Sequence, residues 1–202
     1  MNFSRFQTEL RPLLVFTSRD IHKVDPGFNP VNLNNWQKNG YIIKLGKGLY
    51  TFADHNVDKK LLYFAANKII DPSYISCESA LSFHGILRIE DPIVSVNPIK
   101  SYTYKSQYGG YKFHKTKPEL MNNYDLIQYN QHYFKIATVE KAIVDFFFFN
   151  PKYQTRNQIE KIPFDKERLN NTADEQEILR IATEYKNKLL ARRIRNFNNI
   201  FS

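Results

Sequence analysis

The segment NLNNWQKNGYIIKLGKGLYTF, residues 32–52, joins an asparagine-rich stretch to two short apolar runs. Pro30 suits the first position of a helix and Gly40 suits the position just beyond its end, so residues 30–39 are expected to be helical. The two apolar runs flank Gly-Lys-Gly, which predicts a β-hairpin over residues 41–52. Because asparagine is a mediocre helix former, its abundance in this helix needs another reason.

The faces of this helix supply a reason. At about 100° per residue, Leu33 and Trp36 project together and should pack on the preceding part of the chain. The opposite face is polar, and amide and ammonium side chains can hydrogen-bond to base edges and phosphates in a DNA major groove. A merely solvated polar face is the alternative. The residues expected to contact DNA from this helix are Asn32, Asn34, Asn35 and Lys38.

Two further helical patterns, at residues 3–14 and 17–24, precede the asparagine-rich helix. Three helices followed by a hairpin with a lysine at its tip have the order of a winged helix-turn-helix. In that arrangement the third helix enters the major groove, and the hairpin reaches the adjacent backbone or minor groove. Lys44 and Lys47 are then expected to contact phosphates. A winged helix that contacts protein is the alternative.

The composition is typical of a globular chain, with 42% apolar and 24% charged residues. The net charge of +9 favours anionic partners such as nucleic acid. The single cysteine, Cys77, excludes an internal disulfide framework and a multi-cysteine zinc site. The N-terminus lacks the apolar run of a signal peptide, and the longest apolar run, residues 142–149, is too short to span a bilayer. A cytoplasmic protein without membrane contact is expected.

After residue 56 the pattern changes. Helices are expected over residues 57–70 and 76–84, and between residues 92 and 137 the period shifts to two, which predicts several antiparallel strands. Gly109-Gly110 lies between two of these strands and predicts the turn of a hairpin. A further helix is expected over residues 138–149.

The expected fold class is α+β with two domains. Residues 1–56 are expected to form the winged helix-turn-helix, and residues 57–202 an α/β domain with an antiparallel sheet. A helical pattern over residues 174–198 predicts that this domain ends in a long amphipathic helix.

Two other basic regions could form a secondary nucleic-acid or partner surface. In the hairpin over residues 101–117, lysines alternate with tyrosine and phenylalanine, a mixture that can bind a nucleic-acid backbone. The favoured alternative is that the aromatic face packs into the domain while the lysines remain in solvent, where they protect an edge strand from pairing with another chain. The arginines near the C-terminus suit either the helix dipole or a partner. The residues are Lys105, Lys112, Lys115, Arg192, Arg193 and Arg195.

No catalytic residue, metal ligand or cofactor is expected. The chain has no Walker loop, zincin motif or nucleophile elbow. His84 has no partner at metal-ligand spacing and is expected to be structural. Glu140 and Asp145 fall on different sides of one helix, where they should satisfy backbone or basic groups. The acid-x-Lys sequences that begin at Asp58 and Glu184 keep a metal-dependent nuclease as a minor alternative.

Three blocks, in order, resemble the AbiEi family of antitoxins from abortive-infection (type IV) toxin–antitoxin systems. They are KNGYIIKLGKGLYTF (38–52), YISCESALSFHGI (74–86) and ATVEKAIVDFFF (137–148). The resemblance implies an N-terminal winged helix and a C-terminal α/β antitoxin domain. It also implies binding to double-stranded DNA at the protein's own promoter, neutralisation of a nucleotidyltransferase toxin, and no enzymatic activity. A stand-alone transcriptional regulator is the alternative, and a monomer or weak oligomer is expected.

Overall fold

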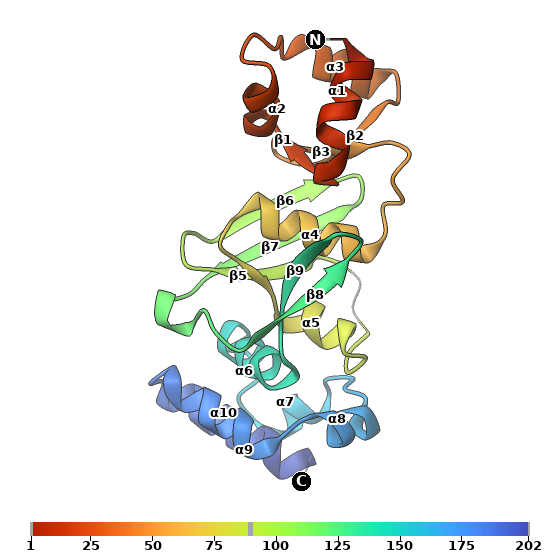
Figure 1. Cartoon of the computed structure of the whole chain (residues 1–202). Helices are drawn as coiled ribbons and strands as arrows, with labels where there is room; N and C mark the ends of the chain where they lie inside the picture. The colour runs from red at the N-terminus through yellow and green to blue at the C-terminus, as the bar shows by residue number, and fades with distance from the viewer. Residues whose placement is uncertain (1, 89–90, 202) are drawn as a thin grey trace.

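Figure 1 shows an elongated molecule with the two chain ends at opposite ends. The computed structural model describes residues 2–88 and 91–201. From the N-terminus, a group of helices stands on a small sheet, a larger sheet with helices packed against it forms the middle, and further helices form the far end (Figure 1).

Residues 2–52 form three α-helices and a small antiparallel sheet of strand order β1-β3-β2. The third helix begins at Val31, one residue later than predicted, and the Asn29 side-chain oxygen accepts the backbone N–H of Val31 at 3.0 Å. The first helix ends at Leu10, earlier than the pattern over residues 3–14 predicts, and tightens into a 3₁₀ turn, η1, that contains Pro12, because proline interrupts an α-helix. The elements are α1 (Phe3–Leu10), η1 (Arg11–Leu13), β1 (Phe16–Thr17), α2 (Ser18–Val24), α3 (Val31–Lys38), β2 (Ile42–Gly46) and β3 (Leu49–Phe52).

An aromatic cluster holds these elements together. The ring of Phe6 lies 4.4 Å from that of Trp36, 5.2 Å from that of Phe16 and 5.8 Å from that of Phe52, measured between centroids. All four side chains are buried. Tilted and edge-to-face pairs of this kind add about 0.5–1.5 kcal/mol each beyond their buried area. Trp36 therefore fixes α3 against α1 and the sheet.

The rest of the described chain forms a six-stranded sheet and seven α-helices. Helices α7 and α8 were not anticipated from the sequence. The elements are α4 (Lys59–Ile69), β4 (Tyr74–Ile75), α5 (Cys77–Phe83), β5 (Ile93–Asn97), β6 (Tyr102–Ser106), β7 (Gly109–Lys115), η2 (Pro118–Leu120), β8 (Tyr124–Tyr129), β9 (His132–Ala137), α6 (Val139–Phe149), α7 (Arg156–Glu160), α8 (Lys166–Thr172), α9 (Glu175–Glu184) and α10 (Lys188–Phe201).

The six-stranded sheet has the order β6-β7-β5-β4-β9-β8 and is mixed, so the prediction of an antiparallel sheet is only partly correct. Strands β5 and β7 are parallel, as are β4 and β9, and the other neighbours are antiparallel. The alternation of apolar and polar residues identifies a strand, but it does not give the direction of its neighbours. Strand β7 lies between β5 and β6, and this order depends on pairing between residues far apart in the sequence, which a local pattern does not reveal.

The hairpin prediction at Gly109-Gly110 is displaced, because both glycines lie inside β7 and the turn is formed by Gln107 and Tyr108. The glycines are needed for a close approach. A Cβ on Gly109 would lie 2.8 Å from an oxygen of Asp91, and Gly109 has a φ of +114°. The N–H of Gly110 donates to the same carboxylate.

The predicted long C-terminal helix is two helices, α9 and α10. The break includes Lys186, whose φ is +49°. Asn187 then begins α10, because its side-chain oxygen accepts the N–H groups of Leu189 and Leu190, both at 3.0 Å. The apolar spacing continues across the break, so periodicity alone does not reveal it.

Two hydrophobic clusters form the interior. The smaller one is the aromatic cluster of the N-terminal helices. The larger one fills the second sheet and its helices and also includes residues that precede residue 56. The domain boundary at residues 56–57 stays a prediction. The N-terminal contributors to the larger cluster are Leu14, Val15, Leu45 and Leu49.

Candidate nucleic-acid interface

Helix α3 presents a polar face to solvent. Leu33 and Trp36 are buried, as predicted. Asn34, Asn35 and Lys38 are exposed on the other side, and Asn32 is half-buried. Helix α3 ends at a turn in which Gly40 has a φ of +70°, a backbone conformation that glycine adopts without strain. The four residues expected to face DNA thus lie on one short helix that is anchored from behind.

A groove of about 650 Å³ lies beside the C-terminal end of α3. Gln37 and Lys44 line it from α3 and β2, and Tyr104, Lys105 and Gln107 line it from β6 and the turn that follows. Among the described residues that line it there is no carboxylate. The structure therefore brings Lys44, predicted as a phosphate contact, next to Lys105, which was predicted as part of a separate surface. Sequence patterns gave no signal for this meeting of β2 with β6, because it is a long-range contact.

Lys47 lies elsewhere. A Cβ on Gly46 would come within 2.8 Å of the Ile69 side chain, so the β2–β3 turn packs against the end of α4. Lys47 lines a groove of about 420 Å³ together with Arg19 and Lys68. Lys44 and Lys47, grouped on one hairpin in the sequence, therefore belong to different grooves.

In the β6–β7 hairpin, buried aromatic residues alternate with exposed lysines, as the favoured alternative for this region predicts. Tyr111 and Phe113 are 1% exposed, whereas all three predicted lysines of this region are exposed. His114 stacks on Phe149 with ring centroids 4.3 Å apart. Its burial, reinforced by the positive charge of Lys112, lowers the pKa of His114 to about 4, so the imidazole is neutral near pH 7. The exposed lysines are Lys105, Lys112 and Lys115.

The three arginines of α10 do not form one surface. Arg192 and Arg195 are exposed, but Arg193 is 5% exposed. Its guanidinium donates to the backbone oxygens of Phe147 and Leu189. The prediction of Arg193 as a contact residue is wrong, because these carbonyl groups hold it inside. Helix α10 also lies at the opposite end of the molecule from α3 (Figure 1).

Lys141 and Asp145 form a fully buried ion pair, and Lys141 was not identified from the sequence as the partner. Lys141 Nζ lies 3.6 Å from Asp145 Oδ1, and both side chains are 0% exposed. Lys141 also donates to the backbone oxygen of Leu120 at 2.9 Å. The spacing of four inside an apolar run was the available signal, since only a partnered charge is stable there. Asp145 thus satisfies a basic group, as expected.

Three hydroxyl groups complete this network. Tyr74 and Ser76 donate to Asp145 Oδ2 at 2.9 and 2.7 Å, and Tyr185 donates to Oδ1. Ser76, the first residue of the helix expected over residues 76–84, lies at the N-cap of α5, but its hydroxyl is directed to the carboxylate and does not cap the helix. Burial and the Asp145 carboxylate raise the pKa of the Tyr74 and Tyr185 hydroxyls well above the ordinary value. The network joins β4, α5, α6 and the α9–α10 break.

The remaining candidate groups have structural partners. The His84 ring nitrogen Nε2 lies 2.9 Å from the backbone oxygen of Ala137. Cys77 is 0% exposed, and burial raises the pKa of its thiol well above the ordinary value. Glu140 accepts the backbone N–H of Asp174 at 3.1 Å. These contacts account for all three by packing and hydrogen bonding.

The two acid-x-Lys sequences have partners too. Asp58 caps α4 by accepting the N–H of Leu61 at 2.8 Å, and it accepts the hydroxyl of Tyr129 at 3.0 Å. Glu184 pairs with Arg180 at 2.7 Å. Within residues 2–88 and 91–201, no three His, Cys, Asp or Glu side chains gather in a way that could hold a metal ion.

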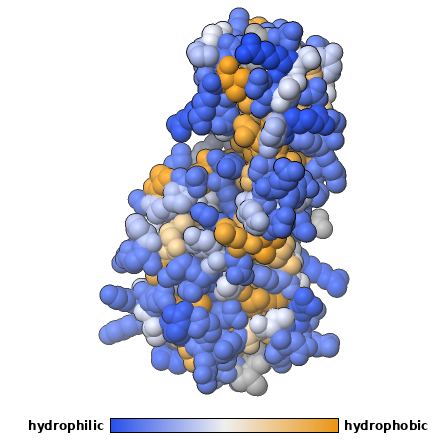
Figure 2. All heavy atoms as spheres, viewed as in Figure 1, coloured by the Kyte–Doolittle hydropathy of each residue, from blue (hydrophilic) through white to orange (hydrophobic). Residues whose placement is uncertain are grey.

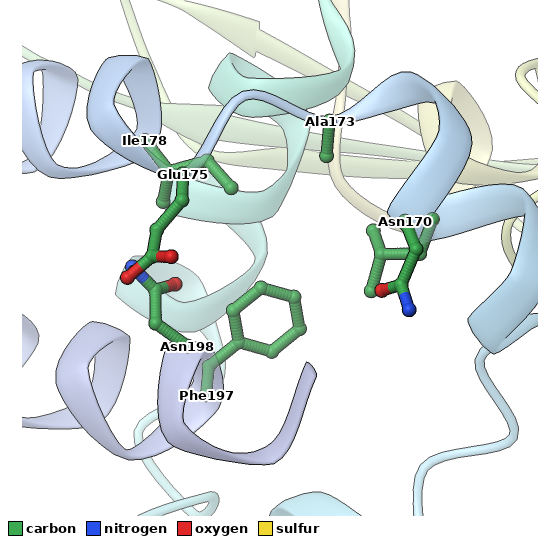
Figure 3. A pocket seen from close by; sticks show the side chains of 7 residues that line it. Asn170, Ala173, Glu175, Ile178, Phe197 and Asn198 are labelled. Carbon is green, nitrogen blue, oxygen red and sulfur yellow. The ribbon is translucent and has the colours of Figure 1, made fainter. Parts of the chain in front are cut away.

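A small pocket of about 170 Å³ lies among the C-terminal helices. Figure 3 shows the ends of Glu175 and Asn198 next to each other on one side of it, with the ring of Phe197 beside them and Asn170 on the opposite side. The Asn198 amide donates to Glu175 at 3.3 Å. The Glu175 and Asn198 side chains that line this pocket therefore bind each other.

Among the helices that the structure describes, none combines the length and apolar character needed to cross a bilayer. No family model matches the chain, and no curated protein matches its sequence. Its structure is similar to the crystal structure of the RV2827C protein from Mycobacterium tuberculosis, with a TM-score of 0.59 and 13% sequence identity. The match covers 96% of this chain and 75% of that chain. At this level of identity, the chain shares a mixed α+β fold with that mycobacterial protein, and the similarity extends to the fold alone.

Proposed function

We propose that the chain is a DNA-binding transcriptional repressor of the AbiEi type, which binds its own promoter through an N-terminal winged helix-turn-helix and neutralises a nucleotidyltransferase toxin. The observation that carries the DNA half is the exposed face of α3. Its amides and lysine can reach base edges and phosphates, while Leu33 and Trp36 anchor the helix from the core side. The helix order and the β1-β3-β2 sheet suit a winged helix.

The phosphate contacts are assigned by proximity to α3. Lys44 and Lys105 line the groove beside the C-terminal end of that helix, and the described lining adds no acidic group to oppose a phosphate. A duplex whose major groove receives α3 would place its backbone along this groove. Lys47, together with Arg19 and Lys68, would contact the backbone at a second position if the duplex extends past the β2–β3 turn, although Asp71 also lines that groove.

The antitoxin half rests on the three sequence blocks that resemble the AbiEi family. Two of these blocks meet in space. Tyr74 and Ser76 come from residues 74–86, and Lys141 and Asp145 come from residues 137–148, and all four join the buried network. The second and third blocks therefore share one core. A stand-alone regulator without a toxin partner is the alternative.

The first experiment is a salt titration of binding to the upstream DNA of the protein's own gene, with a scrambled duplex of equal length. We expect tighter binding to the upstream DNA and an affinity that falls with salt as counterions are released. Equal and weak binding to both duplexes would refute sequence-specific repression.

Paired variants separate the two kinds of contact. Asn34→Ala with Asn35→Ala should reduce the preference for the upstream DNA, at about 1–3 kcal/mol per lost base contact. Lys44→Gln with Lys105→Gln should weaken binding to both duplexes and reduce the salt slope by about one to two. Lys161→Gln with Lys188→Gln, at the far end of the molecule, removes the same two charges and is the control for the change in net charge.

The toxin is tested separately. A nucleotidyltransferase encoded beside this gene should copurify with the chain. Expressed alone it should inhibit cell growth, and coexpression with the chain should relieve that inhibition. Specific DNA binding without either result would support the stand-alone regulator.

A further inference from the structure

Strand β8 is an open edge. It is one of the two outermost strands of the six-stranded sheet, and β6 is the other. An outermost strand presents backbone N–H and C=O groups that can pair with another strand, and proteins usually protect such edges with lysine, proline, a bulge or a cover. The β6 edge carries Lys105 and lies beside β2. Strand β8 contains one charged residue, Asp125, but no lysine, proline or glycine, and its pairing with β9 runs without a shift of register.

The ladder between β8 and β9 fixes which backbone groups point outward. The N–H of Thr138 donates to the oxygen of Asn123 at 3.1 Å where the ladder begins. In an antiparallel pair, hydrogen-bonded and non-hydrogen-bonded pairs alternate. Lys135, opposite Leu126, accordingly donates its N–H to the Asn67 side chain at 2.7 Å. The residues whose backbone groups point to the open edge are therefore Tyr124, Leu126 and Gln128.

Exposed apolar side chains accompany this edge. Leu126 is 61% exposed and Tyr133 is 57% exposed. They lie on the same face of the sheet, because Leu126 is paired with Lys135 and Gln128 with Tyr133. Figure 2 shows apolar atoms at mid-height on a largely hydrophilic surface, at the level of β8 in Figure 1. The edge thus offers both backbone groups and apolar surface.

We propose that the chain self-associates through β8, which pairs antiparallel with β8 of a second copy about a two-fold axis at Leu126. In this register Leu126 faces Leu126 of the partner subunit, and Tyr124 faces Gln128 of the partner subunit. All three outward-facing residues then pair, with about six backbone hydrogen bonds. Asp125 faces Ile127 of the partner subunit, so no like charges oppose each other.

Among the ways in which two copies of β8 can pair, its residues favour this register. A two-fold axis perpendicular to the sheet pairs residues of the same face, so the neighbouring registers are centred on Asp125 and on Ile127. The register centred on Asp125 would place two aspartates opposite each other, which is destabilising. The register centred on Ile127 would pair Tyr124 with Asn130, which has a φ of +54° in the turn after β8, and a backbone pair would be lost. Strand β8 is therefore most complementary to itself about Leu126. A contact between two edges is small, so the dimer should have a dissociation constant in the micromolar range.

Sedimentation equilibrium of the full chain tests the proposal between about 1 and 300 µM, a range that brackets such a constant. We expect a reversible monomer–dimer equilibrium. Leu126→Lys places two lysines opposite each other and should raise the dissociation constant at least about tenfold. Ile99→Lys, at another apolar side chain that is 51% exposed, is the matched control and should leave the constant unchanged.

Because Leu126 faces Leu126 of the partner subunit, two variants of opposite charge at this position should restore each other's dimerisation. Leu126→Lys and Leu126→Asp should each dimerise weakly alone, whereas an equimolar mixture should restore dimers because opposite charges then meet across the axis. Far-UV circular dichroism checks that each variant is folded. A wild-type chain that stays monomeric throughout the range overturns the proposal and leaves the edge for a strand of another protein. A dimer insensitive to Leu126→Lys, or a mixture that fails to restore dimers, also overturns it.

Discussion

The Asp145 carboxylate accepts hydrogen bonds from three hydroxyl groups and pairs with Lys141, all in the interior. Asp145→Ala would leave the Lys141 ammonium buried without its counter-charge. We expect a loss of about 3–5 kcal/mol in the free energy of unfolding, measured with urea. Replacement of both, Lys141→Met with Asp145→Leu, should cost less than Asp145→Ala alone. Glu177→Gln, which removes an exposed pairing with Arg180, should leave the midpoint nearly unchanged. Equal costs for the exposed and buried changes would contradict this account.

His114 gives a pH-dependent prediction at the same scale. Its pKa is about 4 in the folded chain against 6.5 for a free histidine, so the unfolded chain binds more protons between these values. The free energy of unfolding should therefore fall as pH falls from about 6.5 to 4, by about 1–2 kcal/mol after screening by solvent. His114→Phe keeps the stacking on Phe149 and cannot titrate. Urea unfolding of both proteins isolates the effect, and identical pH profiles would refute it.

At the scale of elements, the break between α9 and α10 depends on two residues with opposite effects. Asn187→Ala removes the acceptor for two N–H groups of α10 and should cost about 1 kcal/mol. Lys186→Gly relieves a backbone at φ +49° and should be neutral or stabilising by up to about 1 kcal/mol. Thermal unfolding of the two variants provides the measurement. If both substitutions lowered the melting temperature, or both raised it, the cap at Asn187 and the strained backbone at Lys186 would not have the opposite effects on stability that we expect.

The elements also show how far sequence patterns reach. Helix α3 with its buried Leu33 and Trp36, and strands β5 to β9, were predictable because period and turn residues act locally. The parallel pairing of β5 with β7 was not, since the side-chain alternation of a strand is the same for either direction of its neighbour. The groove between Lys44 and Lys105 was unpredictable for a different reason, since its two sides come from segments that are distant in the sequence.

At the scale of the whole molecule, the N-terminal helices and the larger sheet share contacts across residue 56. Leu45 and Leu49 lie in the larger core, His132 Nε2 lies 2.9 Å from the backbone oxygen of Pro12, and Gly46 packs against Ile69. Removal of the larger sheet would expose these apolar side chains. The two parts should therefore unfold together, although the sequence divides them into separate domains.

The single tryptophan makes this coupling measurable, because Trp36 lies in the N-terminal aromatic cluster while most helix and strand residues lie beyond residue 56. Trp36 fluorescence and far-UV circular dichroism should give the same urea midpoint. Leu45→Ala, which creates a cavity between the two parts, should lower both midpoints equally, at a cost of about 2–5 kcal/mol. Val31→Ala changes an exposed side chain on α3 and is the control. If fluorescence changes at a lower urea concentration than dichroism, the N-terminal part unfolds independently, and residues 1–56 behave as a separate domain.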